Sequence, residues 1–469
     1  STDTLTYIDN KTLQVVPLSG TERWEQMAPD RWRFWLRQGV TFHNEEPFNA
    51  EAAKFAIDFQ GDAGNGHLSH SYTDVVSAEV VDDYTVDVVC QVSCPIYPKT
   101  AFFTRFQAPA WYQAASEAEQ VGMTVGFGPY QLKEWRRGES ITMTAYENYL
   151  ARTDVAEAQM PHIKEMTQLY RAEATVRAAM VQTGEADLAF EIGFENTEAV
   201  PKAVVGGTAE MAALKVDTLW HPALQKKEVR QALVHAMDCQ TIVQGLYDGR
   251  VTCTGNSAPA GTLGLTPENS EPYEYNPARA KELLEQAGYN GEEIALKTQV
   301  GRFYRDVELV EAIVGYWIEA GINAKVEALE LGIHSDLGRS GCGRYEDRAL
   351  ECMNLSPPPP GNASPHVITS TPSLETLDFA KIAIQTLSCS SIRSFVCEPD
   401  RLEPLITQAI AATGEERNAQ MERLATMLHD DVLIIGLFEL VAVYGMNEDL
   451  IWEPRYDRRV RLNMMSFKQ

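Results

Sequence analysis

The sequence has few basic residues relative to acidic ones. Its 469 residues include 40 Lys and Arg against 66 Asp and Glu, which gives a formal net charge of −26. The excess of acid is shared by residues 1–200 and 201–469. Proteins that bind a phosphate backbone need clustered cations. We therefore expect no nucleic-acid partner.

Long apolar runs are also missing. The longest, residues 432–446, is interrupted by Glu439 and is shorter than the roughly 18 uncharged residues of a membrane-helix candidate. This excludes a transmembrane helix. The opening Ser1-Thr2-Asp3-Thr4 lacks the basic and apolar regions of a signal peptide. We expect that any targeting segment has been removed.

The common catalytic signatures are absent. There is no G-x-S-x-G, G-x-x-x-x-G-K, H-E-x-x-H or kinase catalytic loop. Gly126-Phe127-Gly128 begins like a dinucleotide-binding fingerprint, but its third glycine position is Gln131. His67 and His70 have a spacing that could hold a metal on one helical turn, although their glycine-rich surroundings favour a solvated loop. We expect no enzyme activity, cofactor or resident metal.

The cysteines are even in number and fall as near neighbours. There are eight, and those closest in sequence are Cys90 and Cys94, Cys239 and Cys253, Cys342 and Cys352, and Cys389 and Cys397. This distribution suits local disulfides in an oxidising compartment, and no two have the Cys-x-x-Cys spacing of a zinc or thioredoxin site. The connectivity does not follow from the sequence, and free buried thiols are the alternative.

Hydrophobic periodicity predicts a β-rich first third followed by alternating strands and helices. We expect strands within 78–92 and over 163–169 and 432–438, and helices over 49–59, 172–183, 227–237, 277–287, 306–320 and 415–429. Residues 351–372 include four successive prolines, Pro357–Pro360, which cannot donate backbone hydrogen bonds. This segment is expected to be a stiff loop.

Five phrases, in order along the chain, resemble those of family 5 extracellular solute-binding proteins, the dipeptide-, oligopeptide- and nickel-binding components of ABC importers. They are Leu36-Arg37-Gln38-Gly39-Val40-Thr41-Phe42-His43-Asn44, Gly126-Phe127-Gly128-Pro129-Tyr130, Gly184-Glu185-Ala186-Asp187-Leu188, Val229-Arg230-Gln231-Ala232-Leu233 with Ala236-Met237-Asp238, and Tyr275-Asn276-Pro277-Ala278-Arg279-Ala280 through Gly288-Tyr289.

The resemblance implies an α/β, two-lobe periplasmic-binding-protein fold with a hinge and an extra β-rich subdomain in the first lobe. We expect the β-rich subdomain over 1–130, the α/β part of the first lobe over 131–214 plus 440–469, and the second lobe over 215–439. The lobes would enclose the ligand, and its binding would shift a conformational population without breaking bonds.

The implied function is the solute-binding component of an ABC importer, which captures a peptide or other small organic molecule and delivers it to a membrane permease. We expect a monomer in the periplasm or outside the cell, with lipid anchoring before processing left open. The first alternative is a ligand-sensing protein that docks on a receptor. The second, less favoured alternative is a hydrolase that uses the same cleft.

Two features depart from the family pattern. Asn44-Glu45-Glu46-Pro47 lacks the glycine of the family's G-x-G-E-P turn. In peptide-binding relatives, a later loop carries an acid that holds the peptide amino group. The corresponding residues here, 352–359, include neither an acid nor an aromatic residue. This weakens the peptide and nickel-chelate interpretations.

Candidate ligand-binding residues of the first lobe combine aromatic walls with a polar anchor. Arg105, in the family's cleft-side loop, could hold a carboxylate with its guanidinium group. Phe103 and Phe127 are candidates for the walls, whereas Tyr130 is expected to be structural. A local ion pair for Arg105 and core packing for Phe103 are the alternatives.

On the second lobe, Trp220 and His221 follow the expected chain crossing and could form a wall, with core packing as the alternative. Arg302 and Tyr304 precede a predicted helix N-terminus, where an anion can bind, and a solvent-exposed charge is the alternative for Arg302. The loop that carries specificity in relatives contributes Met353, Asn354 and Ser356 as further candidates.

Overall fold

The computed structural model describes residues 3–61, 75–341, 364 and 366–468. The chain divides into two compact units. Unit 1 comprises Ser1–Val205, Val443–Arg455 and Arg459–Gln469, and unit 2 comprises Gly206–Ala442 and Tyr456–Arg458. Residues 206–214, 440–442 and 456–458 thus belong to unit 2, whereas the sequence placed them in the first lobe. The mixture of helix and sheet confirms the α/β class.

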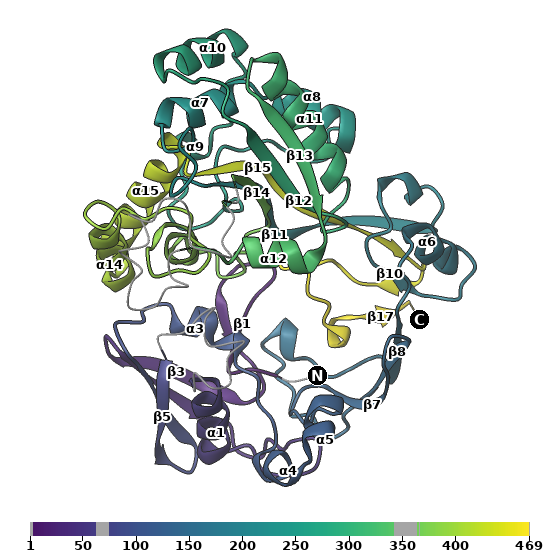
Figure 1. The fold of residues 1–469 in the computed structure, drawn as a ribbon. Helices are drawn as coiled ribbons and strands as arrows, with labels where there is room; N and C mark the ends of the chain where they lie inside the picture. Colours follow the sequence, from purple (N-terminus) through teal and green to yellow (C-terminus); the bar gives the residue numbers. More distant parts are fainter. Residues whose placement is uncertain (1–2, 62–74, 342–363, 365, 469) are drawn as a thin grey trace. The chain divides into compact units, whose positions relative to one another are not determined.

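Unit 1 is built largely from antiparallel sheets (Figure 1). A four-stranded sheet has the order β3-β4-β6-β5, and a three-stranded sheet has the order β7-β8-β9. The strands of this unit include β1 (Thr6–Ile8), β2 (Val15–Pro17), β3 (Thr21–Ala28), β4 (Arg31–Leu36), β5 (Val75–Asp82), β6 (Thr85–Cys90), β7 (Tyr130–Arg136), β8 (Ser140–Ala145), β9 (Glu165–Leu169), β10 (Leu188–Ala189), β16 (Leu450–Ile451) and β17 (Ser466–Phe467). Its helices include α1 (Ala50–Gly61), α3 (Tyr97–Thr100), α4 (Pro109–Ala114), α5 (Glu117–Gly122) and α6 (Ala174–Gln182). The expected strand pair around Asp82 is confirmed as β5 and β6.

The core of unit 1 joins two of the sequence motifs. Phe42 packs edge to face on Phe127, with ring centroids 5.7 Å apart, and both side chains are buried. His43 donates its backbone N–H to the Gly126 carbonyl at 2.8 Å, and its Nε2 lies 2.9 Å from the Gly128 carbonyl oxygen. Segments far apart in sequence are thus fixed to each other by backbone hydrogen bonds and aromatic packing.

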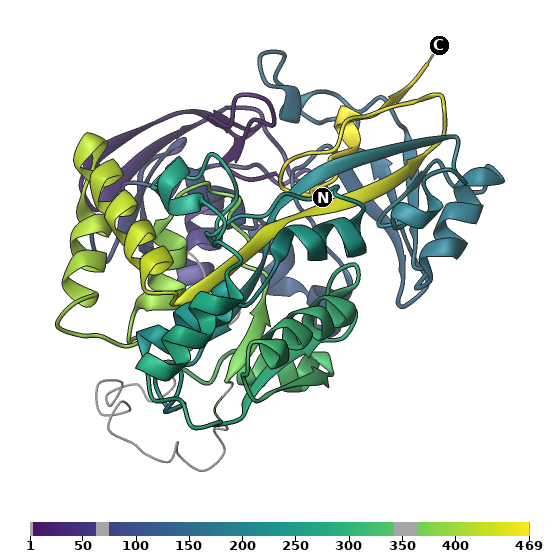
Figure 2. The ribbon, with the colours of Figure 1, turned by 90° about the horizontal axis from the view of Figure 1, so that it is seen from above.

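Unit 2 is organised around a mixed sheet. The full strand order is β10-β15-β11-β14-β12-β13, in which β12 runs parallel to both β13 and β14, and β11 runs antiparallel to β14. These strands are β11 (Lys202–Val216), β12 (Ile294–Gln299), β13 (Ala324–Leu329), β14 (Val367–Ser370) and β15 (Ile434–Met446). The neighbouring strands β11 and β15 are the longest arrows in Figure 2.

The chain passes between the units on β11 and β15. The first boundary falls between Val205 and Gly206, and another falls between Ala442 and Val443. The sequence interpretation placed the crossings near 212–218 and 438–443. The first crossing therefore lies earlier in the sequence than expected, because most of β11 belongs to unit 2.

Helices cover the sheet of unit 2. They include α7 (Lys227–His235), α8 (Cys239–Tyr247), α9 (Pro267–Ser270), α10 (Pro277–Gln286), α11 (Asp306–Glu319), α12 (Leu331–Leu337), α13 (Ala380–Ile382), α14 (Glu403–Ala411) and α15 (Gly414–Asp430). The α11 helix packs on β12 and β13 (Figure 1). Asn276 caps α10 by accepting from the Arg279 N–H at 3.0 Å, and Gly288 follows with a left-handed φ of 59°.

Two expectations about elements need correction. The segment up to Pro372 was expected to be a loop throughout, but Val367–Ser370 forms β14 between β11 and β12, because it can pair with both neighbours. The remainder of the proline-rich stretch, with Pro357–Pro360, lies outside the described residues. The sequence interpretation also omitted α8, α12 and α14, which are short helices.

The expected local disulfides are confirmed for three pairs of neighbouring cysteines. Bonds join Cys90 to Cys94, Cys239 to Cys253 and Cys389 to Cys397. Cys342 and Cys352 lie outside the described residues. No helix in the described part of the chain is long and apolar enough to cross a bilayer.

Candidate functional site

In unit 1, the candidate Phe103 lies at the end of a 3-10 turn, Ala101–Phe103, that follows α3. Its ring packs on Phe102 with centroids 4.0 Å apart, and both side chains are buried. The Arg459 guanidinium lies 4.8 Å from the Phe102 ring and 5.5 Å from the Phe103 ring. Phe103 is thus a core residue, and its ring makes a cation–π contact with Arg459.

Further arginines gather beside this aromatic pair. Arg455 and Arg461 each approach the Tyr7 ring, at 4.7 Å and 4.8 Å from its centroid. Arg455 pairs with the buried Glu157 at 2.7 Å, and Arg461 pairs with Asp3 at 2.9 Å. Burial opposes the charge of Arg461, but Asp3 outweighs it and raises the pKa of this guanidinium. These two cations therefore have structural partners within unit 1.

Arg105 differs from them. Part of its side chain is accessible to solvent, and no hydrogen bond or ion pair joins it to another described residue. Desolvation, followed by the positive charges of Arg459 and Arg461, lowers its pKa. The alternative of a local ion pair is not realised among the described residues, and the guanidinium keeps its donors for a ligand.

The second aromatic candidate of unit 1, Phe127, is 1% exposed. Its ring contacts Phe48 at 4.2 Å and Phe106 at 5.8 Å between centroids. This placement argues against a contact between Phe127 and a solute. Tyr130 is likewise buried and donates its hydroxyl to the Ile163 carbonyl at 2.8 Å, which fits the structural role expected for it.

In unit 2, the candidate Arg302 is engaged by an acid of β11. Its Nη2 lies 3.1 Å from both carboxylate oxygens of Glu210, and Arg458 approaches the same carboxylate at 3.4 Å. The Asp306 carboxylate, at the start of α11, fixes the preceding loop by accepting from the backbone N–H groups of Arg302 and Phe303. The Glu210 carboxylate thus faces two guanidinium groups, and the Asp306 carboxylate lies beside the same loop.

Tyr304 lies on the same loop. Its ring centroid is 6.2 Å from that of Tyr247, whose hydroxyl donates to the Tyr304 carbonyl at 3.1 Å. The Arg305 guanidinium donates to the Tyr304 hydroxyl at 3.1 Å. The structure therefore brings Tyr304 and Arg302 together on one loop that precedes α11.

Trp220 and His221 belong to the packing of unit 2. His221 is buried; its Nε2 lies 3.0 Å from the Glu293 carbonyl oxygen, and its Nδ1 accepts from the Leu224 N–H. Trp220 packs against the Cys389–Cys397 disulfide and Leu219. These contacts match the core-packing alternative, most clearly for His221.

The sequence interpretation missed Lys215, which lies in the apolar strand β11. Its Nζ donates to the Arg393 carbonyl at 3.0 Å, and no described carboxylate pairs with it. Desolvation lowers its pKa to about 7. The signal was a single lysine within the apolar run Met211–Val216, a residue type that is almost never fully buried unless paired.

His334 connects Lys215 with the Arg302 cluster. Desolvation lowers the pKa of His334, and the charges of Lys215 and Arg302 lower it further. Its Nε2 lies 3.2 Å from the Thr369 hydroxyl on β14. Lys215 and Arg302 thus form a pair of cations beside His334, here called the unit 2 cation cluster, that suits a negatively charged ligand group.

Three candidates from the sequence, Met353, Asn354 and Ser356, lie outside the described residues, as do His67 and His70. Among the described residues, no group of His, Cys, Asp and Glu is arranged to hold a metal ion.

The structural comparisons show that the fold matches that of two-lobe periplasmic binding protein structures. The chain superposes over 100% of its length on the oligopeptide-binding protein AppA from Bacillus subtilis in complex with a nonapeptide, with a TM-score of 0.78, 18% identity and 93% of that chain covered. It matches the dipeptide binding protein from Pseudoalteromonas sp. SM9913 in complex with Met-Leu over 100% of its length, with a TM-score of 0.80, 19% identity and 94% of that chain covered.

Residues 14–340 match the family described as bacterial extracellular solute-binding proteins, family 5 Middle, and the chain belongs to this family. It is 30% identical over 267 residues to the glutathione-binding protein GsiB of Salmonella typhi, covering 54% of this chain and 49% of that protein. It is 27% identical over 311 residues to GsiB of Escherichia coli strain K12, covering 63% and 58%. The matched region thus spans about half the length of these curated relatives.

Proposed function

We propose that the protein is the solute-binding component of an ABC importer, which captures a small solute and delivers it unchanged to a membrane permease. The observation that carries this proposal is the family match over residues 14–340. The fold is consistent with it, because two units joined by strand crossings can respond to a ligand by a shift in population. Enclosure of the solute by the two lobes stays a prediction.

The proposed solute is a short peptide or another small organic molecule that carries a carboxylate. Two relatives are described as glutathione-binding, and a structural neighbour was solved with Met-Leu; all of these ligands carry carboxylates. The unit 2 cation cluster supplies Lys215 and Arg302 for such a group. We propose both as anchors, because an anion would supply the charge partner that Lys215 lacks among the described residues.

The proposed partner is a permease, and the proposed setting is the periplasm or the cell exterior, where disulfides persist. The protein is proposed to act as a monomer. A ligand-sensing protein that docks on a receptor would use the same solute site, and chromosomal neighbours that include no permease would favour that alternative.

The test is to identify the solute that co-purifies with the intact protein. Purified protein is denatured gently, and the released small molecules are analysed by mass spectrometry against a mock purification. We expect one enriched carboxylate-bearing compound, which rebinds at one molecule per chain and is recovered unchanged. Conversion of that compound during incubation would contradict the proposal and favour the hydrolase alternative.

A further inference from the structure

We propose that unit 1 carries a ligand site of its own, which binds a small carboxylate attached to a ring or to an apolar chain of similar size. The site is complete within unit 1 and does not rest on the proposed function. It gives Arg105 a role in a pocket, whereas the sequence interpretation assigned this residue to the captured solute.

The pocket lies between the C-terminal half of α1, the segment that follows the turn Ala101–Phe103, and α4. Its volume is about 170 Å³. It is lined by Phe55, Ala56, Phe59, Gln60, Arg105, Gln107 and Tyr112. Positions 55, 56, 59 and 60 fall three and four residues apart on α1, so they share one face of the helix.

The walls of the pocket are aromatic. Phe55 and Phe59 lie with ring centroids 6.3 Å apart, and Tyr112 lies 5.8 Å and 5.3 Å from them. A cavity of about 150 Å³ lined by apolar side chains holds one benzene molecule. The volume and the walls therefore suit a single ring or a short apolar chain.

Two polar groups of the pocket lack partners. Gln60 is only 9% exposed, and its amide nitrogen makes no hydrogen bond in the described structure. Arg105 likewise has no described hydrogen-bond partner. Leaving a buried amide donor unpaired is unfavourable, and a ligand that accepts from it would remove this cost.

One further polar side chain of the pocket, that of Gln107, is already satisfied. Gln107 donates to the Thr124 hydroxyl at 2.9 Å and accepts from the Val125 N–H at 2.9 Å. The guanidinium of Arg105 and the amide nitrogen of Gln60 therefore remain as donors for a ligand, beside the Tyr112 hydroxyl, which can donate or accept. An ionised carboxylate offers only acceptors and matches these donors.

The electrostatic balance also favours an anion. The α1 helix ends at Gly61, so its terminal carbonyl groups place about half a negative charge at this end. The full positive charge of Arg105 exceeds that value. Arg459 and Arg461 act on Arg105 with the same sign, and a bound carboxylate would relieve this repulsion between cations.

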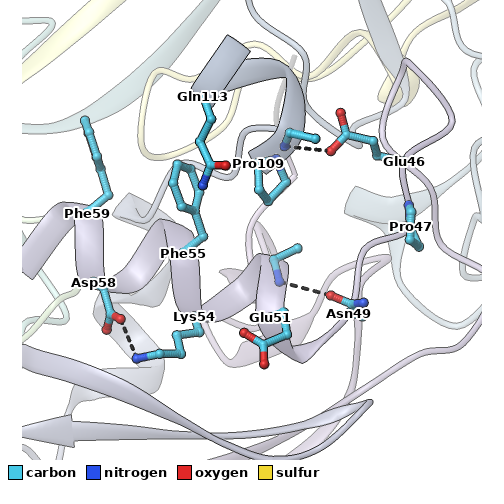
Figure 3. Close-up of a pocket in the computed structure, with 12 residues that line it drawn as sticks. Glu46, Pro47, Asn49, Glu51, Lys54, Phe55, Asp58, Phe59, Pro109 and Gln113 are labelled. Carbon is cyan, nitrogen blue, oxygen red and sulfur yellow. Dashed lines mark hydrogen bonds and ion pairs between the residues drawn. The ribbon is translucent and has the colours of Figure 1, made fainter.

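A larger neighbouring groove lacks these properties (Figure 3). It has a volume of about 730 Å³ between α1 and α4, and shares Phe55 and Phe59 with the pocket. Three of its charged side chains are engaged locally: Lys54 pairs with Asp58 at 2.5 Å, and Glu46 accepts from the Ala110 N–H at 2.9 Å. The fourth, Glu51, is an acid and would repel a carboxylate. The smaller pocket is thus the better candidate for a carboxylate.

The test uses benzoate as the probe and benzamide as its neutral analogue, with ligand-observed saturation-transfer NMR on the full chain. We expect saturation transfer to benzoate and at least tenfold weaker binding of benzamide. Arg105→Gln should weaken benzoate binding at least tenfold, and Phe59→Ala should weaken it as well.

The matched control is Arg137→Gln, since Arg137 is also an exposed arginine of unit 1, lies over the Trp135 ring at 5.2 Å and does not line the pocket. This variant should bind benzoate like the unaltered protein. Thermal melts of all variants confirm that they are folded. Absence of benzoate binding, equal binding of benzamide, or equal losses in the Arg105 and Arg137 variants would overturn the proposal.

Discussion

Many residues of the sequence motifs bind backbone atoms. Arg230 of the V-R-Q-A-L phrase is buried and donates to the carbonyl groups of Leu224, Gln225 and Asp431. Arg37 donates to the Ser19 and Leu150 carbonyls. Such residues satisfy loop carbonyls that would otherwise be buried without partners. This explains why the motifs identify the family and the fold but not the solute.

His43 predicts a pH dependence of stability. Burial lowers its pKa to about 4, whereas the unfolded value is near 6.5. The folded state therefore binds fewer protons than the unfolded state between these values, and stability should fall as the pH falls from about 6.5 to 4. His43→Gln should reduce this slope by up to about 1.4 kcal/mol per pH unit, as measured by urea unfolding at several pH values.

The control for this measurement is His162→Gln, because His162 is exposed. His366, whose pKa burial also lowers to about 4, should maintain part of the slope in both variants. Equal slopes of stability against pH in the His43 variant and the unaltered protein would show that burial does not lower the pKa of His43 in the folded state.

Replacement of Lys215 should change both the pH dependence of stability and the affinity for the solute. Its folded pKa near 7 lies below the unfolded value of about 10.4, so stability should rise with pH between these values. Lys215→Met should abolish this rise and weaken binding of the identified carboxylate solute at least tenfold, because a charge-assisted hydrogen bond contributes about 1.5–3 kcal/mol. Thermal melts and calorimetric titration measure the two effects.

Lys325→Met serves as the charge-matched control for Lys215. Lys325 is a half-exposed lysine of β13 paired with Glu293 and Glu327. Its loss should leave solute binding unchanged. Unaltered affinity in the Lys215 variant would remove Lys215 from the proposed anchors.

Single side chains were the least predictable part of the candidate site. Arg302 was expected from the sequence, but its pairing with Glu210 depends on how β11 and the loop before α11 meet in space. Phe127 follows a family motif, yet only the tertiary packing shows that it lies in the core. Periodicity and spacing predict the helix or strand in which a residue lies. They do not predict which residues of other elements it contacts.

At the scale of elements, the expected helices included α10, which has one-sided periodicity and the caps Asn276 and Gly288, and α11, which has one-sided periodicity over 14 residues. The omitted α8 and α14 have 9 residues each and α12 has 7, and α8 has its apolar residues at Ile242, Val243 and Tyr247 within two turns. A pattern of that length fits a strand or a helix equally well. The strand β14 was missed because its pairing partners are distant in sequence.

The disulfides give a prediction at the same scale. The Cys239–Cys253 bond closes a loop with a sequence separation of 14, and the Cys90–Cys94 bond closes one of 4. Replacing both members of the longer loop by Ala should lower the free energy of unfolding by about 3 kcal/mol, on the chain-entropy estimate for a loop of about 15 residues. The same replacement at Cys90 and Cys94 should cost less, and denaturant titration would reveal any reversal of this order.

For the whole molecule, the sequence was sufficient for the family and the α/β class, since five phrases occur in the family's order between residues 36 and 289. The unit boundaries were less accessible, because β11 and β15 are continuous strands with no break in pattern where the chain passes between units. The identity of the bound solute depends on only a few side chains, and the chemistry of those side chains differs among family members.

The most direct test of solute capture is a calorimetric titration of ligand-free protein with glutathione and a panel of short peptides, followed by chemical analysis of the bound compound. We predict saturable binding of a carboxylate-bearing solute at one molecule per chain, with the compound recovered intact. Failure of every carboxylate-bearing solute to bind, or recovery of a chemically altered compound, would contradict the account.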